Sequence, residues 1–162
     1  MNRLNDIYSP ILGGVETTTD VRNLDKSIDL TNVWLRDILS QLKWQSKESA
    51  YQALRGTLHV LRDRLPAGEA VDLAAQLPLV VKGIYYDGWT LRDKPEKFKK
   101  EEFARRVHAQ FEFDVNINPT EVIRAVLLVM YRHMGDGELR DVRSNMPKDI
   151  QKWFPEEVAP RE

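Results

Sequence analysis

The chain matches itself when it is shifted by 69 residues, which places Arg55 on Arg124. Identities are modest, but apolar positions, glycines, acidic residues and prolines keep the same order in both halves. The other matched pairs include Trp34 and Phe103, Leu58 and Leu127, Gly68 and Gly137, Glu69 and Glu138, Asp72 and Asp141, Leu73 and Val142, and Pro78 and Pro147. A match at this long period predicts two copies of one unit that close on each other. We place the copies at residues 28–85 and 97–154.

Apolar residues recur at the spacing of amphipathic helices, three and four positions apart. One such face consists of Tyr51, Leu54, Leu58, Leu61 and Leu65. Its counterpart in the second copy consists of Ile123, Leu127, Met130 and Met134. No segment alternates with a period of two between turn signals, so no sheet is expected. The sequence therefore predicts an all-α bundle of about eight helices, four in each pseudo-symmetric copy.

Helix-start and helix-stop residues flank the counterpart helices of the two copies. Asn118 is a favourable N-cap, and Pro119 suits the first helical position after it. Ser46 is the corresponding cap in the first copy. Pro66 and Gly135 follow the two helices and are expected to end them.

The chain is predicted to form one helical domain over residues 27–158, with residues 86–96 linking the copies. Residues 1–26 carry apolar side chains, but Pro10 interrupts any helix there. We interpret this stretch as an irregular N-terminal arm that either wraps the bundle or docks on binding. Because each copy has few long helices of its own, the two are expected to share one core.

Composition narrows the functional classes. The 162 residues are enough for one domain that buries roughly 70% of its unfolded surface. Lys and Arg number 24 against 25 acidic residues, so the chain lacks the basic surplus of a general nucleic-acid binder. The absence of cysteine excludes disulfides, thiolate metal sites and cysteine nucleophiles. With no apolar run near ~20 residues and no apolar signal core at the start, we predict a cytoplasmic protein without a membrane partner.

Three stretches of the chain together resemble a known family. Residues 54–65 read LRGTLHVLRDRL, residues 69–78 read EAVDLAAQLP, and residues 83–89 read GIYYDGW. In this order they resemble the bacterial family called domain of unknown function 2267. Residues 137–143, GELRDVR, followed by Pro147, are similar to the second half of that family.

The resemblance covers about residues 28–155. It departs from the family pattern at Gly56-Thr57, where an alanine-valine pair is usual, and at Asp87, where glutamate is common. The resemblance implies a small helical bacterial protein. Because the family carries no established activity, substrate or cofactor, no catalytic residue is carried over from it.

The residues show no pattern typical of a reactive centre. His59, His108 and His133 are far apart and form no pair at metal-ligand spacing on one helix. The chain has no Gly-x-Ser-x-Gly motif and no glycine-rich phosphate loop. We therefore predict no catalytic residue, no metal site and no cofactor.

Residues 92–106 contain seven Lys or Arg and four acidic residues. The simpler interpretation is a solvated linker that runs into a helix start. The alternative is a contact for an anionic partner, although phosphate binding normally uses more closely clustered cations.

Residues 85–89, Tyr-Tyr-Asp-Gly-Trp, carry a large aromatic content in a short stretch. In one interpretation Tyr85 ends a core helix, Gly88 caps it, and Trp89 folds back onto the bundle. In the other, Tyr86, Asp87 and Trp89 form an exposed patch that anchors a partner. These three residues are the candidate partner-binding residues of the sequence.

The residues favour a non-enzymatic module that associates with itself or with another protein. The alternative is an enzyme or small-ligand-binding protein with a pocket between the two copies, where Tyr86 and His59 would contribute. The sequence does not decide between them, but it favours the module because no reactive group is assembled.

Overall fold

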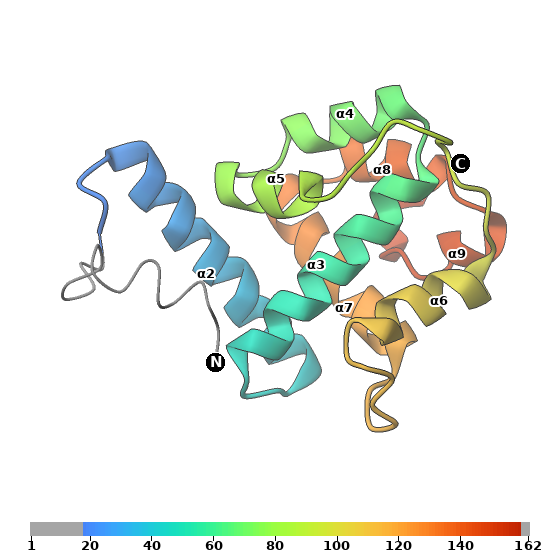
Figure 1. Cartoon of the computed structure of the whole chain (residues 1–162), viewed down its shortest axis with the longest axis horizontal. Coiled ribbons are helices and arrows are strands. Elements are labelled where there is room, and N and C mark those ends of the chain that lie inside the picture. The colour runs from blue at the N-terminus through green and yellow to red at the C-terminus, as the bar shows by residue number, and fades with distance from the viewer. Residues whose placement is uncertain (1–17, 160–162) are drawn as a thin grey trace.

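The computed structural model describes residues 18–159, which form helices and connecting loops without any strand (Figure 1). These residues contain eight α-helices and one short 3-10 helix, so the predicted all-α bundle of about eight helices is confirmed. The helices are α2 (Arg22–Leu42), α3 (Lys47–Arg64), α4 (Ala67–Ala75), α5 (Leu79–Tyr86), α6 (Lys100–Ala109), α7 (Pro119–Met134), α8 (Gly137–Ser144), α9 (Lys148–Gln151) and η1 (Glu156–Val158).

The predicted arm (1–26) is shorter than expected at its C-terminal end. Residues 1–17 lie outside the described part, but α2 begins at Arg22, inside the predicted arm. The Asp25 carboxylate fixes this start, because it accepts hydrogen bonds from Thr19 N and Oγ1 at 2.7 and 2.8 Å. A carboxylate in the first turn is also favoured by the helix dipole. Val21, the residue before the helix, supplies no side-chain cap, so the sequence carries no N-cap signal for this helix start.

Helices α3 and α7 form the centre of the bundle. α3 packs against α2, α5, α6 and α7, and α7 packs against α2, α3, α6 and α8. Leu58 and Leu61 of α3 and Leu127 and Met130 of α7 are fully buried in one continuous core. None of the helices in residues 18–159 has both the length and the apolar character needed to cross a membrane.

The predicted helix caps are present. The Ser46 side chain accepts a hydrogen bond from Ser49 N at the start of α3. Asn118 Oδ1 accepts from Thr120 N at 3.0 Å at the start of α7. At the other end of α7, Gly135 has a φ of 82°, a conformation that glycine adopts without strain.

Helices α2 and α6 end in the same way at positions 69 residues apart. Trp44 N donates to Leu39 O at 3.0 Å, and Phe113 N donates to His108 O at 3.2 Å. Such bonds, which reach back five residues over a left-handed residue, are typical of the Schellman motif. The left-handed residues are Lys43 and Glu112, with φ of 55° and 54°. Each of these two helices also packs on both central helices, α3 and α7.

Leu127→Ala tests the central packing. We expect a loss of about 3 kcal/mol in the free energy of unfolding, because the substitution leaves a cavity where all surrounding helices meet. Equilibrium urea denaturation measures this loss. Leu91→Ala is the matched control, because Leu91 is 64% exposed and its truncation should cost less than about 0.5 kcal/mol. Equal losses in the two variants would contradict a core centred on α3 and α7.

Candidate functional site

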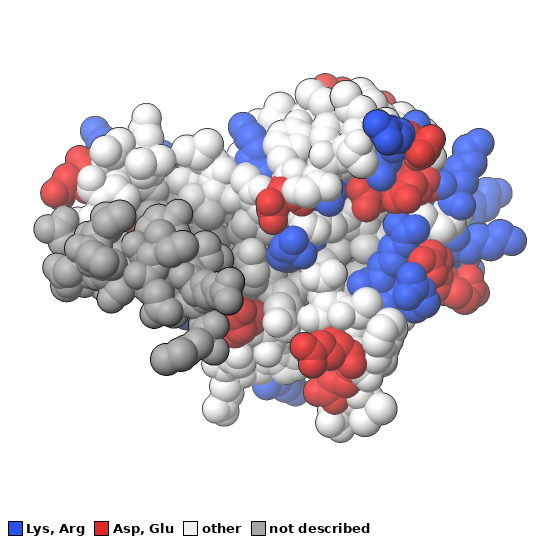
Figure 2. All heavy atoms as spheres, viewed as in Figure 1, with Lys and Arg blue, Asp and Glu red and all other residues white. Residues whose placement is uncertain are grey.

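Charged side chains gather on the face that carries the link after α5 and the helix α6 (Figure 2). Arg62 of α3 lies beneath them and is only 5% exposed. Its Nη1 donates to Tyr85 O and to Asp87 O, the latter at 2.7 Å, and its Nε lies 3.3 Å from Asp63 Oδ1. A buried cation therefore satisfies carbonyls at the C-terminus of α5, where positive charge is favoured.

The link is tied to α3 and α6 through Lys94 and Glu96. Lys94 Nζ lies 3.5 Å from Asp63 Oδ1 and 3.4 Å from Glu96 Oε2. Glu96 N donates to Asp63 O at 2.8 Å, and its carboxylate accepts from Arg106 Nη1 at 2.9 Å. Burial raises the pKa of Glu96, but the hydrogen bond and charge of Arg106 outweigh it, so this pKa lies below its ordinary value.

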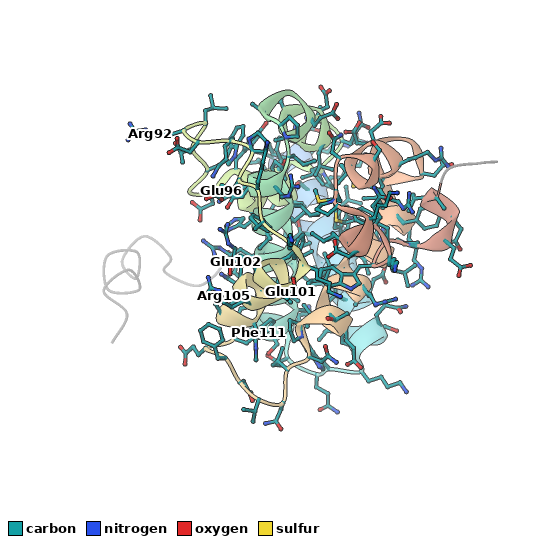
Figure 3. The ribbon with its side chains drawn as sticks, turned by 90° about the vertical axis from the view of Figure 1, so that its right-hand side faces the viewer. Arg92, Glu96, Glu101, Glu102, Arg105 and Phe111 are labelled. Atoms are coloured by element: carbon teal, nitrogen blue, oxygen red, sulfur yellow. The ribbon has the colours of Figure 1, made fainter. Side chains whose placement is uncertain are left out.

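Helix α6 continues the network. Arg105 donates twice to Glu102, at 2.7 and 2.8 Å, and Arg106 donates to it at 3.0 Å. These hydrogen bonds lower the pKa of Glu102 to about 2. Figure 3 shows Glu96, Glu102 and Arg105 along one side of the molecule, while Arg92 projects away from it. The remaining cations of the stretch 92–106 are exposed and form no ion pair with another described residue: Arg92, Lys97, Lys99 and Lys100.

The three candidate partner-binding residues lie together at the end of α5. Gly88 has a φ of 74° and turns the chain, so that Trp89 packs partly buried against the core. The Trp89 and Tyr86 ring centroids are 5.4 Å apart. Asp87 is exposed, and its Oδ2 lies 3.3 Å from Arg55 Nη2. This arrangement matches the first interpretation of the stretch, in which glycine ends the helix and tryptophan folds back.

The three histidines lie on separate elements and each has a partner. His59 and His108 donate to backbone carbonyls at 2.7 Å. His133 Nε2 lies 2.6 Å from Asp37 Oδ2, and its ring stacks on Trp34 with centroids 5.3 Å apart. This contact between α7 and α2 was not predicted, because 96 residues separate its two polar partners. Within residues 18–159, no group of three or more His, Asp or Glu is arranged to hold a metal ion.

Several hollows lie beside the central helices. One, of about 410 Å³, lies between α7 and the α2–α3 turn and includes Trp44 in its lining. A second, of about 300 Å³, lies between α7 and the segment after α9. Arg124 and Leu128 line both, and we call the two together the α7 groove. A third, of about 270 Å³, lies between α3 and α6 and is lined by His59 and Arg105.

Trp89→Ala separates the two interpretations of the aromatic stretch. We expect a loss of about 2 kcal/mol in the free energy of unfolding, because the indole ring packs on Tyr86 and on the core. Thermal and urea denaturation measure the loss, and light scattering measures the mass of the particle. An unchanged melting temperature with a changed mass would instead assign Trp89 to an interface.

His59 is expected to make stability depend on pH. Burial lowers its pKa below 6.5, although its hydrogen bond to Ile84 O opposes the shift. The unfolded chain therefore binds more protons as the pH falls through about 6.5, and the folded state loses stability on the acid side. His59→Leu should flatten this dependence in urea denaturation between about pH 5 and pH 7. Lys97→Leu, an exposed control, should retain the wild-type slope, and a slope unchanged in His59→Leu would refute the assignment.

Comparison with known proteins follows the residues that carried the resemblance. The family model described as uncharacterized conserved protein (DUF2267) matches residues 31–153. No curated protein matches the chain. The match extends from α2 past the end of α9 and includes both four-helix stretches. The chain therefore belongs to the family of uncharacterized conserved proteins DUF2267.

Proposed function

We propose that this protein is a non-catalytic interaction module that associates with a second copy of itself through the N-terminal half of α2. The observation that carries the proposal is the exposure of large apolar side chains on this half. Leu24 and Ile28 are 39% and 38% exposed, and Val21, the residue just before α2, is 51% exposed. Leu30 and Val33 are exposed to a similar degree. A cluster of apolar side chains on a solvent-exposed surface is typical of a contact site.

The half-helix is built the opposite way from an ordinary surface helix. Its buried residues are the polar Ser27 and Thr31, and Ser27 Oγ accepts a hydrogen bond from Val80 N of α5 at 2.8 Å. Its large apolar side chains therefore lie outside the contact with α5. In Figure 1 this half of α2 extends past the other described helices.

A second copy suits this surface. Val21, Leu24 and Ile28 have the three-and-four spacing of a helix-pair seam. A two-fold contact uses the same patch on both chains, so one stripe is sufficient. The neighbouring charges alternate in sign: Arg22, Asp25, Lys26 and Asp29. Because the stripe covers only about two turns, we expect an association that depends strongly on protein concentration.

The proposal includes the duplication predicted from the sequence. The matched helix ends and the packing of both α2 and α6 on the two central helices support it. Features present in both copies then serve the scaffold, and function is sought where the copies differ. The first turns of α2 are such a difference: the positions that correspond to them in the second copy precede the start of α6 at Lys100.

Two other predicted sites receive less support. The hollow between α3 and α6 lies between the copies, as the small-ligand or enzyme alternative requires, but Arg105 there already binds Glu102. Tyr86, Asp87 and Trp89 are engaged with the bundle. They remain a secondary proposed contact, because the Asp87 side chain is exposed at the end of α5.

Analytical ultracentrifugation across the micromolar range tests the proposal. The wild-type mass should rise toward that of a dimer with concentration, and Ile28→Glu should hold the mass at that of a monomer because it places a charge in the seam. Leu91→Glu is the matched control, since Leu91 is more exposed than Ile28 and lies outside α2. A wild-type protein that stays monomeric throughout, or an Ile28→Glu variant that still dimerises, would overturn the proposal.

A further inference from the structure

We infer that the contact between α4 and α8 is a pH-sensitive switch, which is tight when the Glu138 carboxyl is protonated and looser when it is ionised. The switch lies outside the stripe on α2 that carries the proposed function, and it needs no second copy. It is built from four acidic side chains, which we call the carboxylate cluster: Glu69 and Asp72 of α4, and Glu138 and Asp141 of α8.

The order of the residues along the chain explains why like charges meet here. Glu138 and Asp141 follow Glu69 and Asp72 by 69 residues, so α4 and α8 are corresponding helices of the two predicted copies. These two helices pack directly on each other (Figure 1). When a helix packs on its own counterpart, the acidic residues of one come near the acidic residues of the other. The contact therefore gathers negative charge from both helices.

Apolar packing beneath the cluster holds the two helices together. Ala70 and Leu73 of α4 are fully buried in the core, and so are Leu139 and Val142 of α8. The other helix on which α4 mainly packs is α5. A weaker contact with α8 would therefore free one side of α4, while the central packing of α3 on α7 stays in place.

No cation of the described range 18–159 is paired with the cluster. None of the four carboxylates forms an ion pair or a side-chain hydrogen bond with a residue of this range. Glu138 Oε1 is buried and has no hydrogen-bond donor there. An ionised oxygen in this position is costly, because it has lost water and gained no partner. A proton on Glu138 removes the charge and allows the carboxyl to donate a hydrogen bond to a neighbouring carboxylate.

The surroundings of Glu138 favour its protonated form. Burial raises the pKa of Glu138 most, and the negative charges of Asp141, Asp72 and Glu69 raise it further. α7 and η1 also pack on α8, but none of their charged side chains contributes to this shift in pKa. The remaining titratable group is Tyr85 of α5, whose hydroxyl donates to a backbone carbonyl of α4 at 2.7 Å. Burial raises the pKa of Tyr85, so this side chain is uncharged.

The raised pKa of Glu138 sets the sign of the pH dependence. The folded protein holds the Glu138 proton more tightly than the unfolded chain does. The stability contributed by this group is therefore complete below about pH 4.5 and is lost as the pH rises through the raised pKa. His59 acts in the opposite direction, because its lowered pKa removes stability on the acid side. A His59→Leu background separates the two effects.

Glu138→Gln tests the switch, because its amide keeps the shape of the protonated carboxyl at every pH. In the His59→Leu background, the melting temperature should rise by about 2–4 °C as the pH falls from about 7.5 to about 5. Adding Glu138→Gln should abolish this rise. Glu48→Gln is the matched control, since Glu48 is an exposed carboxylate in the first turn of α3, and this variant should keep the rise.

NMR of the full-length protein shows whether protonation changes the contact itself. The side-chain carboxyl carbon of Glu138 should titrate at a higher pH than that of Glu48, and Asp72→Asn should lower the midpoint of Glu138. At about pH 7.5, amide hydrogen exchange in α4 and α8 should be roughly threefold to tenfold slower in Glu138→Gln than in the wild type. Exchange in α2 and α6 should be the same in both proteins.

The inference is overturned if Glu138 titrates at or below the midpoint of Glu48, or if Glu138→Gln leaves the pH dependence of the melting temperature unchanged. Equal amide exchange in α4 and α8 of the two proteins also overturns it, since the carboxyl would then titrate without loosening the contact. Ile28→Glu should leave the titration of Glu138 unchanged, so failure of the proposed self-association is distinguishable from failure of the switch.

Discussion

The packing of α3 against α7 is the contact on which the rest of the molecule depends. Each helix is long and apolar on the faces that meet its neighbours, and each contributes fully buried leucines to the same core. Burial of one such side chain stabilises the fold by about 1.5–3 kcal/mol. Exposure of the apolar face of either central helix to water would therefore destabilise the protein strongly. α2 packs on α7, and α6 packs on α3. The helices before and after the link therefore share one core.

This constraint also decides where binding surfaces can lie. Because other helices cover α3 and α7 on several sides, the side chains of these two helices reach solvent only along narrow strips beside the outer helices. Beside α3, Arg55 and His59 bind Asp87 and Ile84 at the end of α5. The first turns of α2 extend past the other described helices (Figure 1). Several large apolar side chains are therefore exposed at the periphery of the bundle.

Local rules explain which features could be predicted from the sequence. Helical spacing, the caps at Ser46 and Asn118 and the turn at Gly88 each depend on residues a few positions apart, and all are present. The predicted start of α2 lies too far along the chain, because the observed start has no side-chain cap. It is instead stabilised by a hydrogen bond that Thr19 Oγ1 donates to Asp25 Oδ1. Burial of Arg62 could not be predicted, since its acceptors lie 23 and 25 residues away and become neighbours only after folding.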